Sequence, residues 1–189
     1  MKCDCKVVTE KFDVDEEPII REREKTPVVV TLTDHEARFA GLVGFERQLV
    51  STLNGLHEQV TTNDPTSGHN WTQNIESAGA ECALAKWLDR YWSAGVNTFK
   101  AGDVGNIEVR LCMSQNVKLK VAANDPPNRL VVLVTGKMPH YNLEGFIMAK
   151  DAQVLEYRED PGNYGKHAYF VPVKMLHDIR ELRRLLCDR

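Results

Sequence analysis

Apolar residues recur at helical spacing in several parts of the chain. From residue 33 to 54 they return every three or four positions, and Thr33 with Glu36 has the spacing of a capping box at the start of a helix. Residues 73–92 form a second predicted helix, with small or apolar groups on every side, a pattern typical of a buried helix. The last predicted helix carries Met175, Leu176, Ile179, Leu182 and Leu186 on one side.

The alternation typical of β-strands dominates the centre of the chain, where turns rich in Gly, Asn, Asp and Pro separate short segments. One of them, Leu130–Val134, is apolar on both faces, as in a central strand. Together with the helices, the pattern predicts an α/β (α+β) fold with a compact central sheet flanked by helices. The strands are expected at about residues 27–32, 96–101, 106–112, 117–122, 129–135, 142–148 and 168–172.

The length of 189 residues and the hydrophobic content of 42% suit one domain with a single core. Residues 1–25 mix charges without a period, so we expect a charged N-terminal arm before a domain at 26–189. No apolar run reaches the roughly 18 residues of a membrane helix, and the first residues lack a signal peptide core. A cytoplasmic protein without membrane contact is therefore expected.

Composition also limits the chemistry. The five cysteines are an odd number at irregular spacing, so free thiols are expected. The net charge of −3 argues against a protein that coats nucleic acid by bulk electrostatics. It does not exclude a nuclease, because metal-binding acids lower the net charge.

The segment from Asp103 to Arg110 joins two acids, a glycine turn and a cation. Side chains alternate along a strand, so Glu108 and Arg110 project from one face. Two carboxylates hold a hard cation through oxygen, and a nearby positive group neutralises charge on a phosphoryl oxygen. The segment therefore suits a phosphate-cleaving metal site with Asp103, Glu108 and Arg110, and equally a surface hairpin with an ion pair.

Three further side chains are candidates. Glu81 shares a helix face with small and apolar residues, and a lone buried carboxylate is costly unless it is paired or bound to a cation. Pairing with Lys86 or an arginine and a role in the site both stay open. Lys118 and Lys120 lie on one face of a predicted strand, where they are either solvated or contact substrate phosphates.

The order of these elements resembles the core of the PD-(D/E)XK nuclease superfamily, the restriction-endonuclease-like fold. In more detail, the chain is similar to a group of bacteriophage proteins of that fold over roughly residues 27–180. The resemblance implies a single domain and a nuclease encoded by a phage and acting on DNA in the cytoplasm of a bacterial host. The motifs that carry it are Glu76–Lys86, Asp103–Gly105, Glu108–Arg110, Asp125–Pro126, Leu130–Gly136 and Tyr169–Pro172.

The resemblance also implies a ligand set for Mg²⁺ or Mn²⁺. Asp103 and Glu108 would be metal ligands, the Val109 carbonyl a further one, and Glu81 or Glu76 the helix acid that completes the site. Two departures affect this assignment. Arg110 stands where the superfamily has Lys, and a guanidinium cannot serve as a general base. The short spacing from Asp103 to Glu108 leaves a purely structural role for Asp103 open.

Two functions follow as expectations. The first is a Mg²⁺- or Mn²⁺-dependent phosphodiesterase acting on DNA. The alternative is a catalytically degenerate module of the same fold that binds nucleic acid or a host or phage protein, which Arg110 and the mildly acidic charge favour. Many enzymes of this fold act as dimers, so a homodimer is possible, although the sequence shows no distinct interface stripe. Hydrolysis of a small phosphate ester is weaker, because no Gly-rich phosphate loop occurs.

Overall fold

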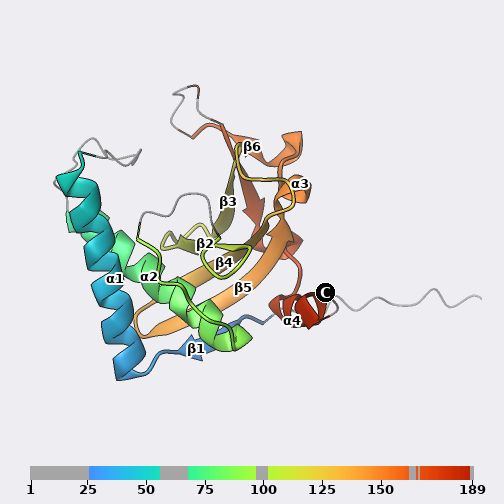
Figure 1. Ribbon diagram of the computed structural model, residues 1–189. Helices are drawn as coiled ribbons and strands as arrows, with labels where there is room; N and C mark the ends of the chain where they lie inside the picture. Colours follow the sequence, from blue (N-terminus) through green and yellow to red (C-terminus); the bar gives the residue numbers. More distant parts are fainter. Residues whose placement is uncertain (1–25, 56–67, 97–101, 162–164, 166, 188–189) are drawn as a thin grey trace, which may run out of the picture.

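The computed structural model describes residues 26–55, 68–96, 102–161, 165 and 167–187. The fold is a single compact mixed α+β domain in which two helices cover one face of a four-stranded sheet and a smaller sheet covers the other (Figure 1). The mixed α+β class and the single domain are thereby confirmed. The predicted arm at 1–25 and most of the predicted strand at 96–101 lie outside the described residues.

The two long helices form the first layer. Helix α1 (Asp34–Leu53) starts with the predicted capping box, in which Thr33 and Glu36 bond each other's backbone N–H groups. Helix α2 (Gly68–Leu88) packs against it. The two backbones approach so closely that a Cβ atom at Gly44 would lie 2.4 Å from the Cα atom of Ile75. The glycine therefore sets the depth at which α1 packs on α2.

Sheet A has the strand order β1-β5-β4-β2, with β1 (Val28–Thr31), β5 (His140–Met148), β4 (Leu130–Lys137) and β2 (Ile107–Cys112). Strands β1, β5 and β4 pair antiparallel, whereas β2 pairs parallel with β4. Strand β2 is an edge strand of this sheet. The predicted acid Asp103 lies at its free edge.

Sheet B has the order β3-β7-β6 and is antiparallel, with β3 (Lys118–Ala122), β7 (Ala168–Pro172) and β6 (Arg158–Glu159). The strand pattern predicted one compact sheet, but β3 pairs with β7 and not with β2 or β4. Leu119 and Val121 on β3 pack against Val131 and Leu133 on β4. The apolar alternation identified β3 correctly but could not tell pairing in a sheet from packing between sheets.

Strand β4 lies between two apolar clusters, and this position explains why its sequence is apolar throughout. Val132 and Val134 belong to an apolar cluster with the helices, and Val131 and Leu133 belong to the cluster with sheet B. All four side chains are fully buried. The prediction of a central strand at this position is confirmed.

The remaining elements close the second layer and the C-terminal end. They are helix α3 (Ala149–Ala152), the 3-10 turns η1 (Leu155–Tyr157) and η2 (Val173–Met175), and helix α4 (Ile179–Cys187). The last helix begins at Ile179 and not near Met175, because Met175 ends a 3-10 turn and is 47% exposed. Cys82, Cys112 and Cys187 are free thiols. Within the described ranges, no helix is long and apolar enough to cross a membrane.

Candidate functional site at the free edge of strand β2

A tight turn positions Asp103 beside strand β2. The Asp103 N–H donates to the Ile107 carbonyl over 2.8 Å, and the Ile107 N–H donates back to the Val104 carbonyl over 3.2 Å. Gly105 in this turn has a φ of 64°, a left-handed conformation that favours glycine. The turn thus folds the chain preceding β2 back along the free edge of the strand.

The Asp103 carboxylate is held at that edge by the strand itself. Its Oδ2 atom accepts a hydrogen bond of 2.7 Å from the Val109 N–H. The N–H and C=O groups of a strand residue point to the same side of the strand, so the Val109 carbonyl also faces the free edge and not β4. A carboxylate and a backbone carbonyl therefore share this edge, as the resemblance implies.

Asp103 is an unusual acid because its surroundings oppose its charge. Burial is the main cause that raises the pKa of Asp103, the carboxylates of Glu81 and Glu108 add to it, and the Val109 N–H and Arg47 lower it, so that the pKa is about 7. The charges of Glu81 and of Glu108 thus each act on Asp103. Asp103, in the turn, therefore lies between Glu81 of α2 and Glu108 of β2 in its electrostatic surroundings.

Glu81 is only 5% exposed and is fully paired. Arg47 of α1 donates from Nη1 to Glu81 Oε1 over 2.6 Å and from Nη2 to Oε2 over 2.8 Å. The Trp92 Nε1–H adds a bond of 3.1 Å to Oε2. Of the partners left open by the sequence, the arginine is correct, because Lys86 pairs with Glu36 over 2.7 Å.

Glu108 and Arg110 do project together, as expected, and they form an alternating chain of charges with two more residues. Glu108 accepts from Arg110 Nη1 over 3.0 Å and from Arg129 Nη1 over 3.1 Å. Arg110 also contacts the Asp125 carboxylate at 3.2 Å, and Asp125 accepts the Ala122 N–H over 2.8 Å. Arg110 is thereby fixed between Glu108 and Asp125.

Glu76 bonds to residues outside the charged chain of Glu108, Arg110, Arg129 and Asp125. Its Oε2 atom accepts the Met138 N–H and the Tyr141 hydroxyl, each over 2.8 Å. Burial, followed by this hydrogen bond to Glu76, raises the pKa of the Tyr141 hydroxyl well above its usual range. Of the two helix acids that the resemblance allowed, Glu81 is the one beside Asp103.

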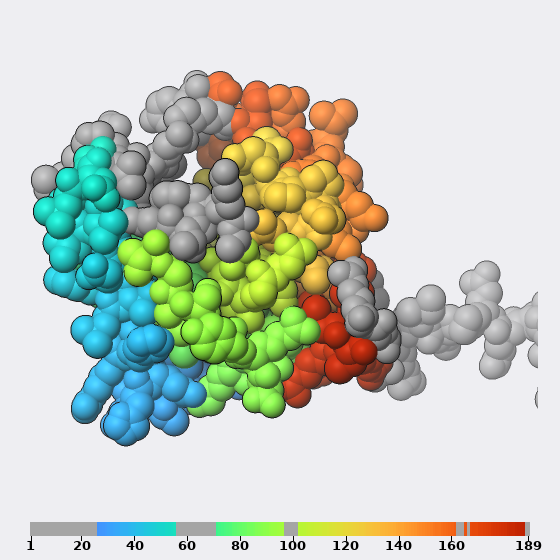
Figure 2. Space-filling model, viewed as in Figure 1, coloured from blue at the N-terminus to red at the C-terminus, as the bar shows by residue number. Residues whose placement is uncertain are grey.

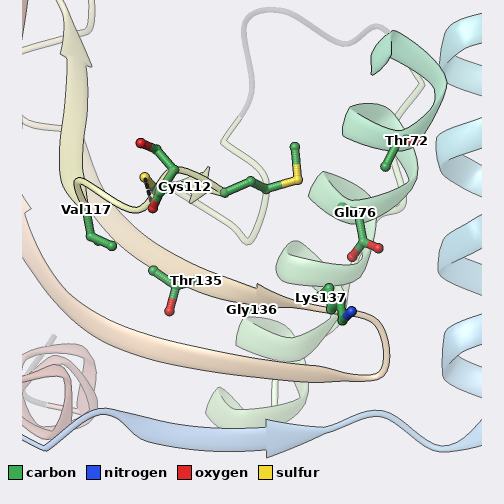
Figure 3. A pocket seen from close by; sticks show the side chains of 9 residues that line it. Thr72, Glu76, Cys112, Val117, Thr135, Gly136 and Lys137 are labelled. Atoms are coloured by element: carbon green, nitrogen blue, oxygen red, sulfur yellow. Dashed lines mark hydrogen bonds between the residues drawn. The ribbon is translucent and has the colours of Figure 1, made fainter. Parts of the chain in front are cut away.

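Glu76 instead lines an open cleft of about 480 Å³ between α2 and the C-terminal ends of β2 and β4 (Figure 3). Because β2 and β4 are parallel, Cys112 and Thr135 meet at this end. Asp103 and Glu108 do not line the cleft. The other lining residues are Thr72, Met113, Ser114, Val117, Gly136 and Lys137.

Lys118 and Lys120 lie on the outer face of sheet B, on the side of β3 away from Leu119 and Val121. Lys118 pairs with Glu159 over 2.7 Å, whereas Lys120 is exposed and lies across the strand pair from Phe170. Strands β2 and β3 belong to different sheets, so these lysines do not share a sheet face with Glu108 and Arg110.

Sequence reasoning did not assign Arg47, Asp125 and Arg129 to the site. Arg47 lies within an apolar helical pattern, and no feature of the neighbouring sequence indicates that it pairs with a residue of α2. Asp125 belongs to the Asp125–Pro126 motif that carries the resemblance, but the sequence assigns it no role in the site. The buried Glu81 was the available signal, since it requires a cation from elsewhere in the chain.

The donors at the β2 edge fit a hard cation only in part. Asp103, Glu108 and the Val109 carbonyl offer oxygen, which Mg²⁺ and Mn²⁺ prefer. In the part of the chain that the structure describes, however, no three His, Cys, Asp or Glu side chains are arranged to hold a metal ion. A cation here would have two carboxylates at most and would keep several waters, as Mg²⁺ commonly does.

Comparison with known proteins adds no family. No model of a protein family, no curated protein and no solved structure matches this chain.

Proposed function

We propose that this chain is a metal-dependent phosphodiesterase of the PD-(D/E)XK type that acts on DNA. One observation carries the proposal: a buried carboxylate, Asp103, is held at the free edge of β2 with the carboxylates of Glu81 and Glu108 acting on it. Such a cluster destabilises the fold unless a cation or a proton compensates it, and strongly perturbed acids gather at functional sites.

Each residue has a distinct role in this proposal. Asp103, Glu108 and the Val109 carbonyl would hold Mg²⁺ or Mn²⁺, and the ion would supply Lewis-acid chemistry that activates water and stabilises charge on the scissile phosphate. Arg110 stays protonated and supplies positive charge at a position fixed by Glu108 and Asp125. Glu81 is a positioning residue, because both of its oxygens are bonded to Arg47 or Trp92.

In this proposal, sheet B makes the contacts to DNA beyond the scissile phosphate. Lys120, and Lys118 once it leaves Glu159, contact backbone phosphates, which provide affinity without sequence readout. An origin in a bacteriophage and action in the cytoplasm of a bacterial host belong to the same proposal.

The test is a cleavage assay on supercoiled and linear DNA with Mg²⁺ or Mn²⁺. Asp103→Asn and Glu108→Ala should each reduce the rate by about 100-fold or more, as is usual when a group that stabilises the transition state is lost. Glu156→Gln is the matched control, because this acid is exposed in η1 and belongs neither to the acids around Asp103 nor to the contacts of Lys118 and Lys120. Wild-type rates in Asp103→Asn and Glu108→Ala would remove these residues from the mechanism.

A second candidate is a catalytically degenerate module of the same fold that binds nucleic acid. The observation that favours it is the pairing of both Glu81 and Glu108 with arginines, together with Arg110 at the lysine position. This candidate predicts DNA binding by the wild type without cleavage under any divalent metal. It also predicts a melting temperature that neither Mn²⁺ nor a chelator changes.

A further inference from the structure

Helix α1 lies along one side of the molecule (Figure 2). Apolar side chains are exposed along its outer face. Leu42 is 67% exposed, Phe39 52% and Phe45 48%. They are three residues apart, so they lie within one face of the helix over less than two turns. Contiguous apolar patches of this kind mark interaction sites more often than scattered surface residues do.

The two phenylalanines on this face are held in place from behind. The Phe39 ring meets Trp92 edge to face with centroids 5.6 Å apart, and the Phe45 ring lies 5.2 Å from that of Trp71. Aromatic side chains that are already ordered lose little entropy when a partner binds. Leu42 between them forms the centre of a preorganised contact.

The charges on the same face are arranged symmetrically about Leu42. Arg38 and Glu46 are exposed and lie four residues before and four residues after it. A two-fold axis at Leu42 that sets two copies of α1 antiparallel places Phe39 of one copy at the level of Phe45 of the other. It also places Arg38 at the level of the partner's Glu46, twice by symmetry.

We propose that this face binds a second copy of the chain as an antiparallel α1–α1 homodimer centred on Leu42. The charge complementarity favours this occupant over an unrelated protein, because a helix face with opposite charges equally spaced about an apolar centre complements itself. The inference is independent of the proposed nuclease activity. In such a dimer α1 contacts α2 through the pair of Arg47 with Glu81 and contacts the second copy through its outer face.

The dimer should be weak. A helix of about 30 Å presents only a narrow strip, which is below the roughly 800 Å² per partner of a standard interface. A dissociation constant on the order of 10 µM is therefore expected, so the chain should be largely monomeric at 1 µM and largely dimeric at about 100 µM.

Sedimentation equilibrium of the full chain over this concentration range tests the proposal. Leu42→Asp should weaken association at least tenfold. Leu53→Asp is the matched control, because Leu53 is 75% exposed on the same helix but lies eleven residues from Leu42, beyond the end of the partner's α1. Circular dichroism checks that both variants are folded.

Charge-reversal variants distinguish the proposed two-fold dimer from non-specific hydrophobic association. Arg38→Glu and Glu46→Arg alone should each weaken the dimer, because like charges then meet, whereas the double variant should recover most of the wild-type affinity. A monomeric wild type at 100 µM, equal losses in Leu42→Asp and Leu53→Asp, or a double variant no better than the singles would overturn the proposal. A larger oligomer insensitive to Leu42→Asp would also overturn it.

Discussion

Two clusters of charge flank strand β2, and they differ in how their charges balance. On the edge next to the helices, Arg47 faces the two carboxylates of Glu81 and Asp103. On the other side, Glu108 and Asp125 alternate with Arg110 and Arg129, each anion beside a cation. The second cluster is neutral within itself, whereas the first has one negative charge too many.

The imbalance indicates which cluster has a use beyond folding. A balanced chain of ion pairs can serve as scaffold for the β2 strand and the turn at Asp125. A buried acid repelled by its neighbours contributes no stability when charged, so the proposed metal site accounts for Asp103 better than a structural role does. Glu108 belongs to the balanced cluster but lies close enough to Asp103 to link the two.

The sharpest contrast in stability concerns the arginines of the two clusters. Arg47→Met leaves the Glu81 charge buried without its cation, which should cost about 3–5 kcal/mol and lower the melting temperature by about 10 °C. Arg110→Met should cost about 1 kcal/mol, because Glu108 keeps Arg129 and Asp125 keeps the Ala122 N–H. Thermal unfolding at pH 7 measures both, and equal losses would mean that the clusters do not differ as described.

Removing the charge of Asp103 and removing the charge of Asp125 should change the melting temperature in opposite directions at pH 8. The raised pKa of Asp103, about 7, means that its contribution to stability is present at low pH and is lost as the pH rises through 7. Asp103→Asn keeps an acceptor for the Val109 N–H without the charge. It should therefore raise the melting temperature by about 5 °C at pH 8 without added metal and by about half as much at pH 5.5, which lies midway between the ordinary pKa of 3.8 and the raised pKa.

Asp125→Asn is the matched control for this experiment. It removes a charge that Arg110 neutralises, so it should lower the melting temperature at both pH values. A destabilised Asp103→Asn at pH 8 would show that the charge of Asp103 is compensated within the fold.

The smallest effect is expected away from both clusters, on sheet B. Lys120→Ala should weaken DNA binding about threefold and reduce the slope of log affinity against log salt by about one, as expected for one phosphate contact. Lys150→Ala serves as the control, since Lys150 is exposed on α3, outside sheet B. Fluorescence anisotropy at several salt concentrations compares them, and a larger effect of Lys150→Ala would exclude sheet B as the binding face.

The sequence predicted the elements well because their signals are local. The capping box at Thr33, the apolar run of β4 and the alternation of β3 each depend on neighbours in the chain. The division into two sheets was not predictable in this way, because Leu119 and Val121 would face an apolar surface in either arrangement.

The candidate site shows the same limit. Glu108 and Arg110 share a face because of strand geometry, and the closeness of Asp103 follows from a five-residue turn. The cation for Glu81 comes from Arg47, 34 residues away, and no local pattern indicates such a partner. Arg129 reaches Glu108 from the position just before β4, and its role depends on the parallel pairing of β2 with β4.

The central claim is that Asp103 and Glu108 bind a divalent cation at the free edge of β2. Calorimetric titration of Mn²⁺ into the full chain at pH 8 tests it directly, with Asp103→Asn as the comparison. The account predicts one saturable site of sub-millimolar affinity in the wild type and none in Asp103→Asn. Absence of saturable binding in the wild type, or equal binding by both proteins, would contradict it.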